Sequence, residues 1–367
     1  MKFAGIIAEY DPFHNGHAWQ LAQAKALGAE RVAVAMSCSL VQRGALPLLP
    51  EAVRTRSALT CGADLVFALP APCACAGAEA FARAGVALLA AAGCDGLVFG
   101  AETPDAALLM EAAELLDSGS YRAALKAQLA GGARSFAAAR QAAAAQLASD
   151  ERVAALLDKP NNNLAVEYCR AIRSLAPRMD AYPLPRQGAN HGEALHSAHG
   201  QFASASALRK LWAEGGADAV APYVPEAVFP LYQEAYAAGQ YTDFSAAGRC
   251  ELALLRSACR GKAPFADIRG VSEGLEHRLE AAVRTSTTYD ELLDALTADA
   301  PPRHGRRAGL HRRQSPRPSA LSPPAGRKEG CPSFIKKLHP PCLPLAGPSA
   351  GIRRCFRSDG RGAACRR

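Results

Sequence analysis

The sequence predicts an α/β protein in which a parallel sheet domain is followed by a mostly helical region and a disordered tail. Four short apolar runs, at residues 3–8, 31–37, 64–70 and 96–102, alternate with helical patterns. Continuous apolar strands are typical of a parallel sheet that is covered by helices on both faces. From about residue 298 the chain is dense in Pro, Gly, Arg and Ser and has no apolar periodicity. Such a segment cannot bury enough apolar surface to offset its chain entropy.

The remaining elements follow from apolar spacing and from capping residues. Gly28 closes the first helix, and Thr288 with Glu291 has the spacing of a capping box at the start of the last one. We expect helices at residues 18–27, 54–61, 74–92 (with one or two breaks), 105–116, 124–147, 163–175, 204–212, 245–258, 272–284 and 289–296, a short strand at 180–184 and a mobile loop at 188–200. The pattern divides the chain into an α/β domain at 1–210 with a helical insertion at about 104–180, a helical region at 211–297 and the tail at 298–367.

The composition excludes several classes of protein. An apolar fraction of 49% and a charged fraction of 21% are typical of a soluble globular chain. The most apolar stretch, residues 70–94, contains Glu79 and Arg83 and makes a poor bilayer span. Glu9 and Asp11 interrupt the first apolar run, which argues against a signal peptide. We therefore expect a cytoplasmic protein with no membrane partner, and nothing in the sequence indicates a protein partner.

Neither the cysteines nor the net charge points to a site in the folded part. The twelve cysteines include no CxxC pair, so structural zinc is disfavoured and buried free thiols are expected. The net charge of +8 comes from the tail, because residues 298–367 contain 16 Lys and Arg against 3 Asp and Glu. The rest of the chain carries a balance of −5.

The strongest candidate site is the segment KFAGIIAEYDPFHNGHAWQL at residues 2–21. Its apolar run is a strand, Pro12 suits the turn that follows, and His14 and His17 can face one way on the first turn of a helix. That turn also offers free N–H groups and the positive end of the helix dipole, which favour anions. Gly16 would let a flat ligand ring approach the backbone. The alternative is that both histidines are ordinary loop and helix residues.

Two further segments suit the same ligand. Ligands of parallel sheets bind beyond the carboxyl ends of the strands, which places His14, Ser37 and Gly100 around one crevice. Ser204 and Ser206 lie near a helix start with Arg209 on the next turn, and hydroxyls and a guanidinium in that order can hold a triphosphate. Alone, the serines could equally be a plain N-cap.

HNGH followed by SxSxxR resembles the nucleotidyltransferase superfamily, which includes class I aminoacyl-tRNA synthetases and the NMN and pantetheine-phosphate adenylyltransferases. More closely, IIAEYDPFHNGH, MSCSLVQRG, DLVFALP, LVFGAE, KPNNNLAVEY, FASASALRK and GVSEGLEHRL resemble the bacterial tRNA(Met) cytidine acetate ligase family. The resemblance runs from residue 1 to about residue 297. It implies a Rossmann-like nucleotidyltransferase domain. It also implies activation of acetate by ATP to acetyl-adenylate and acetylation of N4 of the wobble cytidine of elongator tRNA(Met).

The same resemblance implies site residues. His14 and His17 would be catalytic and would contact the phosphates, and Mg²⁺ would accompany the triphosphate, although no cage of carboxylates for a metal is visible. The residues implied to bind ATP are Ile7, Tyr10, His14, Asn15, Gly16, His17, Gly100, Asn162 (with Asn161), Arg186, Ser204, Ser206 and Arg209. Gln42, Arg43 and Gly44 match a family loop near the site.

Some segments depart from the family pattern. Asp11 stands where the family commonly has Asn, and the family's acidic-Lys-Trp pattern after Arg43 is missing. The family's basic C-terminal helices are replaced by the tail, which is typical either of a shifted reading frame in a GC-rich gene or of a genuine basic arm that contacts RNA phosphates.

Three functions therefore stay open at the level of sequence. The first is the acetate ligase acting on tRNA. The second is a small-molecule adenylyl- or cytidylyltransferase that acts on a phosphate ester, against which the long helical region argues. The third is an RNA-binding protein that has lost its activity, against which the intact histidines, serines and Arg209 argue.

Overall fold

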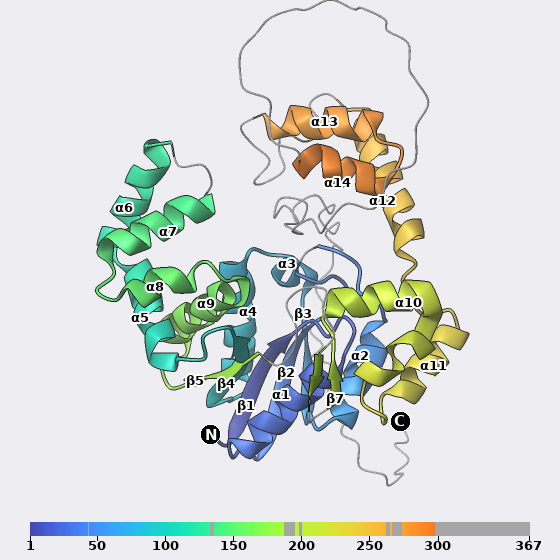
Figure 1. The fold of residues 1–367 in the computed structure, drawn as a ribbon, viewed down its shortest axis with the longest axis horizontal. Coiled ribbons are helices and arrows are strands. Elements are labelled where there is room, and N and C mark those ends of the chain that lie inside the picture. The colour runs from blue at the N-terminus through green and yellow to red at the C-terminus, as the bar shows by residue number, and fades with distance from the viewer. Residues whose placement is uncertain are drawn as a thin grey trace, which may run out of the picture.

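A five-stranded parallel sheet forms the centre of the molecule (Figure 1). The computed structural model describes residues 1–42, 44–132, 136–186, 195–197, 200–261, 265 and 274–297. The strands are β1 (Phe3–Ala8), β2 (Arg31–Ser37), β3 (Leu65–Leu69), β4 (Gly96–Ala101) and β5 (Asp180–Pro185). They lie in the order β3-β2-β1-β4-β5, and each neighbouring pair is parallel. The predicted α/β fold and all five predicted strands are confirmed.

Helices cover both faces of the sheet, as the uninterrupted apolar strands require. One face packs against α4 (Ala78–Ala91), α5 (Ala106–Asp117) and α9 (Pro160–Leu175). The other face packs against α1 (Asn15–Ala26), α2 (Glu51–Thr60), α10 (Ala205–Val220) and α11 (Phe229–Ala237). Both faces of β2 are fully buried from Val32 to Met36, so this strand contributes to both cores.

Glycines set the close approach of α4 to the first strand. A Cβ on Gly85 of α4 would lie 2.5 Å from Cδ1 of Ile7, and a Cβ on Gly5 would lie 2.8 Å from Cδ1 of Leu89. Neither position tolerates a larger side chain without movement of its neighbour. This interdigitation fixes Ile7 at the carboxyl end of β1.

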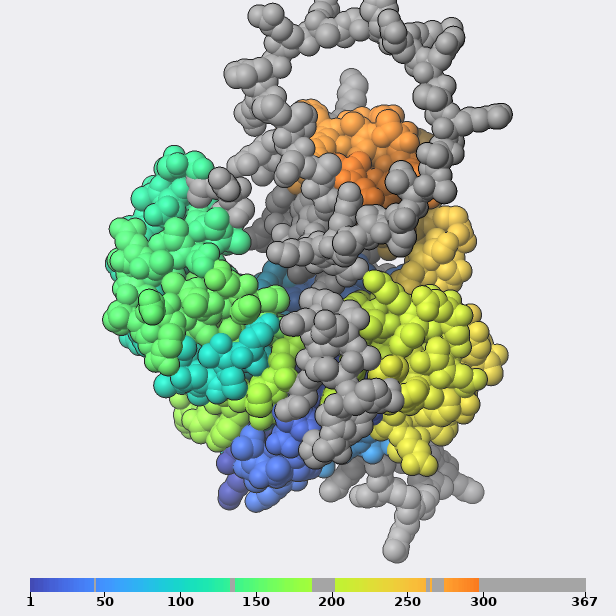
Figure 2. Space-filling view, in the orientation of Figure 1, coloured from blue at the N-terminus to red at the C-terminus, as the bar shows by residue number. Residues whose placement is uncertain are grey.

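The insertion between β4 and β5 is helical, as expected. It comprises α5, α6 (Gly119–Ala130), α7 (Phe136–Leu147), α8 (Glu151–Leu156) and α9. Buried Glu167 on α9 accepts hydrogen bonds from Arg140 and Arg170, each at 2.7 Å, and so ties α7 to α9. Figure 2 shows this insertion and the α10–α11 pair on opposite flanks of the molecule.

The break expected near the 74–92 segment is observed between α3 (Ala71–Ala74) and α4. Two local predictions need correction. The described part of the segment predicted as a loop at 188–200 forms β6 (Leu195–Ser197), which pairs antiparallel with β7 (Gly200–Phe202). The helix predicted at 204–212 continues to Val220, with a break at Gly216 where the Tyr236 ring occupies the position of a Cβ.

The last helices have a core of their own. They are α12 (Phe244–Ala258), α13 (Leu275–Thr285) and α14 (Tyr289–Thr297), and their buried residues include Leu252, Leu279 and Leu292. The core on the α1 face of the sheet continues through α10 to Ala235 of α11. The predicted boundary at residues 210 and 211 therefore falls inside α10, and the change of core falls between α11 and α12. The predicted tail at 298–367 lies outside the described residues.

Among the helices of the described ranges, none combines the length and the apolar character that crossing a membrane requires.

Candidate active site

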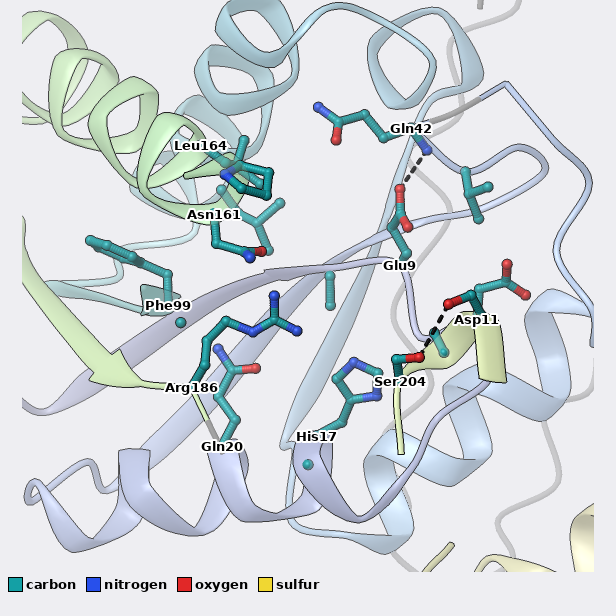
Figure 3. Close-up of a pocket in the computed structure, with 18 of the residues that line it drawn as sticks. Glu9, Asp11, His17, Gln20, Gln42, Phe99, Asn161, Leu164, Arg186 and Ser204 are labelled. Atoms are coloured by element: carbon teal, nitrogen blue, oxygen red, sulfur yellow. Dashed lines mark hydrogen bonds between the residues drawn. The ribbon is translucent and has the colours of Figure 1, made fainter. Parts of the chain in front are cut away.

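A cavity of about 530 Å³ opens at the carboxyl ends of the strands (Figure 3). Its walls come from the ends of β1, β4 and β5, from the first turns of α1, α9 and α10, and from the 41–46 loop. At the start of α9, Pro160 has no N–H and the N–H groups of Asn161 and Asn162 donate to Glu102. The N-termini of α1 and α10 direct their positive dipole ends toward the cavity. The cavity is therefore built to hold a polyanion.

The structure brings most of the predicted site residues to this cavity. The predicted residues that line it are Ile7, His14, Gly16, His17, Gly100, Arg186, Ser204, Ser206 and Arg209. They lie as far apart in sequence as Ile7 and Arg209, so their convergence is a property of the fold.

The two histidines are held by the backbone of their own turn. His14 is the N-cap of α1, and its Nδ1 accepts a hydrogen bond from the N–H of Gly16 at 3.0 Å. The Nδ1 of His17 accepts from the N–H of His14 at 3.3 Å, and the two rings stack with centroids 3.8 Å apart. Because both Nδ1 atoms accept, the proton of each neutral ring lies on Nε2. The HNGH turn thus makes two oriented Nε2–H donors.

Burial keeps these imidazoles neutral. Burial and, to a smaller extent, the positive charge of Arg186 together lower the pKa of His14 to about 4. Burial, then His14, then Arg186 hold the pKa of His17 well below its usual value. At neutral pH both side chains therefore donate hydrogen bonds without carrying charge, and the fixed positive charge of the cavity comes from the arginines.

Gly16 is required for a reason that the sequence did not show. A Cβ at this position would lie 2.9 Å from Cε1 of His14. The ring that approaches the glycine backbone is therefore that of His14 itself. Gly16 allows the N-cap histidine to fold back over the helix start.

The second wall comes from α10. Ser204 is its N-cap and accepts from the N–H of Ala207 at 3.2 Å, and the hydroxyls of Ser204 and Ser206 are 3.1 Å apart. Nη1 of Arg209 donates to the carbonyl of Asp11 at 2.7 Å and to its carboxylate Oδ2 at 3.1 Å. No described residue accepts from Nε or Nη2 of Arg209. This guanidinium is clamped at one nitrogen, and its remaining N–H groups can bind a ligand.

Asp11 links that wall to the loop before α2. Its carboxylate is 5% exposed, and Oδ1 accepts from the N–H of Leu48 at 2.6 Å. Burial raises the pKa of Asp11 above its usual value, whereas Arg209 and the Leu48 N–H act in the opposite direction. Two good hydrogen-bond donors favour the ionised form, and we treat the pair as charged.

Arg54 is a structural element of the site that sequence reasoning missed. Its side chain is fully buried on α2. It donates to the carbonyls of Leu49 at 3.0 Å, of Glu9 at 2.7 Å and of Ser37 at 2.7 Å, and also to that of Cys38. Glu9 directly follows β1, Ser37 is the last residue of β2 and Cys38 follows it. Arg54 therefore fixes the ends of both strands. A helical Arg in the sequence gave no signal of this, because most such residues are solvated.

Glu9 also lines the cavity and was not predicted. Its Oε1 accepts from the N–H of Gln42 at 2.6 Å, which closes the 41–46 loop onto the end of β1 (Figure 3). Ser37, which the sequence placed at the crevice, is fully buried instead, and its carbonyl binds Arg54.

Three predicted residues do not line the cavity. Tyr10 is fully buried, and its ring contacts that of His17 edge-on at 4.8 Å between centroids. Burial raises the pKa of Tyr10, so its hydroxyl stays protonated. The side chain of Asn15 donates to the carbonyl of Pro222 at 3.3 Å. These two residues support the HNGH turn from outside the cavity.

Asn162 is the third. It is fully buried, accepts from the N–H of Thr103 at 2.9 Å and donates to its hydroxyl at 3.1 Å. Its neighbour Asn161 lines the cavity and donates to Glu102 Oε1 at 2.6 Å. Of the NNN run, the first asparagine faces the ligand space and the second anchors α9 to the end of β4.

Away from the histidines, part of the cavity wall is apolar. Phe99 and Tyr168 pack with ring centroids 5.4 Å apart, and both line the cavity together with Leu164. A Cβ on Gly100 would meet only Cγ of Arg186, at 3.5 Å. This side has the shape and chemistry of a site for a planar ring.

The family model described as HIGH Nucleotidyl Transferase matches residues 1–299. This chain belongs to the HIGH nucleotidyl transferase family. The tRNA(Met) cytidine acetate ligase of Syntrophotalea carbinolica is 37% identical over 299 residues, which are 81% of this chain and 70% of the relative. That of Acetivibrio thermocellus is 33% identical over 307 residues, covering 81% and 72%.

Solved structures agree with this membership of the HIGH nucleotidyl transferase family. The crystal structure of apo Thermotoga maritima TmcAL superposes with a TM-score of 0.75 at 30% identity, covering 81% of this chain and 71% of that one. The structure of the same protein bound with alpha-thio ATP gives a TM-score of 0.73 at 29% identity, with the same coverage. The family resemblance found in the sequence is confirmed.

Within this HIGH nucleotidyl transferase domain, no group of three or more His, Cys, Asp and Glu side chains could hold a metal ion among the described residues.

Proposed function

We propose that this chain is a tRNA(Met) cytidine acetate ligase. It activates acetate with ATP and transfers the acetyl group to N4 of the wobble cytidine of elongator tRNA(Met). The observation that carries the proposal is the cavity in which two neutral imidazoles, two serine hydroxyls and Arg209 meet at the N-termini of α1 and α10. The named relatives supply the reaction to which this geometry is fitted.

The triphosphate would lie between the HNGH turn and α10. The Nε2–H groups of His14 and His17, the serine hydroxyls and the free N–H groups of Arg209 are donors suited to phosphate oxygens. The adenine would lie against the Phe99 and Tyr168 wall, near Gly100, Asn161 and Arg186. Tyr10, Asn15 and Asn162 would act on ATP through the groups that they hold in place.

The chemistry needs positioning and charge stabilisation. An acetate oxygen attacks the α-phosphorus, the bond from that phosphorus to the bridging oxygen breaks, and pyrophosphate leaves. Donors fixed before the reaction stabilise the charge that builds on the phosphate oxygens. The N4 amine of cytidine then attacks the acetyl carbonyl, loses a proton and displaces AMP. Mg²⁺, as a partner of the triphosphate, would add positive charge near the leaving group.

Isotope exchange tests the first half of the reaction. Acyl-adenylate formation is reversible while the intermediate stays bound, so acetate should drive labelled pyrophosphate into ATP. We expect acetate-dependent exchange. We also expect weak acetylation of elongator tRNA(Met), because the family's basic C-terminal helices are replaced in this chain. Acetylation should decrease strongly with salt, because the RNA contacts that remain would be mainly to phosphates. Exchange that requires a phosphate ester would indicate a small-molecule nucleotidyltransferase. RNA binding without exchange would indicate a protein that has lost its activity.

A further inference from the structure

One aromatic side chain at the cavity belongs to the helical region that follows the α/β domain. Phe244 is the first residue of α12, lines the cavity and is 38% exposed. Among the described residues, all others that line the cavity precede residue 210. Phe244 is therefore the point at which the α12–α14 unit reaches the ligand space.

Hydrogen bonds on both sides hold Phe244 at this position. Asp243 is the N-cap of α12, and its Oδ1 accepts from the N–H groups of Ser245 at 2.9 Å and Ala246 at 3.0 Å. Thr242 donates from its N–H to the carbonyl of Leu48 at 2.8 Å and from its hydroxyl to that of Pro47 at 2.6 Å. Thr242, which precedes the N-cap of α12, is thus bonded to the loop that borders the cavity.

The same loop is bonded to the cavity wall that α10 forms. The N–H of Leu48 donates to Asp11, and Asp11 accepts from Arg209. Phe244 consequently has a fixed position relative to Arg209. Leu46, which also lines the cavity and is 39% exposed, extends the apolar surface at this rim.

An exposed ring on a hydrogen-bonded backbone at a nucleotide cavity is a surface for a second flat group. Proteins that bind unpaired RNA bases stack them on aromatic side chains, and enzymes that modify a base first take it out of its stack. Such stacking strengthens binding by about 10- to 100-fold per base. The acceptor in the proposed reaction is a pyrimidine base that must enter from outside while the adenylate occupies the cavity.

We propose that Phe244 is the stacking platform for the acceptor cytosine, so that the α12–α14 unit takes part in the transfer step and not in activation. This inference rests on the proposed function. It assigns to one residue of the helical region a direct contact with the RNA substrate.

Measuring the two half-reactions separately in the full-length chain tests it. Phe244→Ala should reduce acetylation of elongator tRNA(Met) in single turnover by about 10- to 100-fold, and should leave acetate-dependent pyrophosphate exchange within about twofold. Phe244→Trp keeps a ring and should retain transfer. A fluorescent cytidine analogue at the wobble position of an anticodon stem-loop should be quenched on binding to the wild type and to Phe244→Trp, but not to Phe244→Ala.

Leu254→Ala is the matched control, because Leu254 is 63% exposed on the same helix and does not line the cavity. It should change neither half-reaction. Equal losses of exchange and transfer in Phe244→Ala would place the ring against ATP and overturn the inference. Undiminished transfer, or quenching that persists without the ring, would overturn it as well. A wild-type chain without acetate-dependent exchange would instead overturn the proposed function itself.

Discussion

Two walls of the cavity, the HNGH turn and the start of α10, are built in different ways. The HNGH wall is local, because the imidazoles of His14 and His17 bind backbone N–H groups two and three residues away. The α10 wall is assembled over a long distance, because Arg209 is held by Asp11, 198 residues earlier. A local wall keeps its geometry wherever strand, turn and helix form. A distant wall keeps its geometry only if α10 is docked correctly.

The docking of α10 depends on the core that both walls share. Leu208 and Trp212 of α10 are buried in one cluster with Tyr10 and Phe13, which flank the HNGH turn. Tyr232 of α11 donates to the carbonyl of Phe13 at 2.7 Å and so ties the same turn to the far helix pair. Substitutions in the HNGH wall should therefore change the reaction rate alone. Substitutions in the α10 wall should also show energetic coupling between the residues that hold one another.

The largest effect is expected from His17→Ala, which removes one oriented donor from the local wall. Loss of such a donor costs on the order of 10²–10³ in rate. Adenylate formation, measured by pyrophosphate exchange, should decrease by this factor while the far-UV circular dichroism stays unchanged. His277→Ala, which changes a largely exposed histidine on α13, should have no effect. A His17→Ala protein that exchanges at the wild-type rate would refute the role of the HNGH wall.

A smaller effect is expected at the distant wall, from Arg209→Lys. A single ammonium cannot bind Asp11 and a phosphate with the geometry of a guanidinium fork, so the Kd for ATP should rise by about tenfold. Asp11→Ala should weaken binding in the same way, and the double variant should be little worse than either single one. Arg56→Lys serves as the control, because Arg56 and Glu234 form an exposed pair away from the cavity. Strictly additive effects in calorimetry would show that Asp11 does not position Arg209.

The free energy of unfolding should vary with pH because of the histidines in the HNGH wall. The pKa of His14 is lowered to about 4 in the folded protein, so the unfolded chain binds the proton first as the pH falls below its ordinary value of 6.5. The free energy of unfolding should therefore be constant above that value and decrease between 6.5 and 4, by up to roughly 1.4 kcal/mol per pH unit. The lowered pKa of His17 also makes the free energy of unfolding decrease as the pH falls.

Urea unfolding of the wild type and of His14→Gln across this range isolates the effect. The raised pKa of Asp11 makes the free energy of unfolding increase as the pH falls. This contribution is present in both proteins and therefore cancels in the difference between them. We expect the difference in the free energy of unfolding to become smaller as the pH falls. A difference that does not vary with pH would mean that His14 is not kept neutral by burial.

The smallest effect is expected from deletion of residues 298–367. Both walls, Phe244 and the three cores precede this segment. A chain that ends at Thr297 should keep its melting temperature and its acetate-dependent exchange, and limited proteolysis of the full chain should remove the segment first. Protection that extends through residues 310–350 would contradict this expectation.

Much of the fold and the centre of the site could be predicted from the sequence. The strands at residues 31–37 and 96–101 followed from uninterrupted apolar runs, and parallel pairing placed their carboxyl ends at one edge. HNGH could be interpreted because its hydrogen bonds lie within four residues, where sequence spacing and spatial distance are nearly the same. SxSxxR was recognised as a phosphate segment, but only the fold brought it to the histidines.

The direction of individual polar side chains could not be predicted. Asn161 and Asn162 are adjacent and chemically identical, yet one faces the cavity and the other is buried against Thr103, because a helix turns each successive residue by about 100°. Nothing in the sequence distinguishes Arg54 from a solvated helical arginine, but in the structure it donates to four backbone carbonyls. In both cases the deciding partners are distant in sequence.

The sequence by itself determined the parallel sheet and the geometry of the HNGH turn, because apolar period and local hydrogen bonds are encoded within a few residues. Only the tertiary structure decided how Arg209 is clamped and that Phe244 of the last helical unit reaches the cavity. Those features depend on which buried donors and acceptors meet across the fold. Each buried polar group must find a partner, and the identity of that partner is set by packing rather than by sequence spacing.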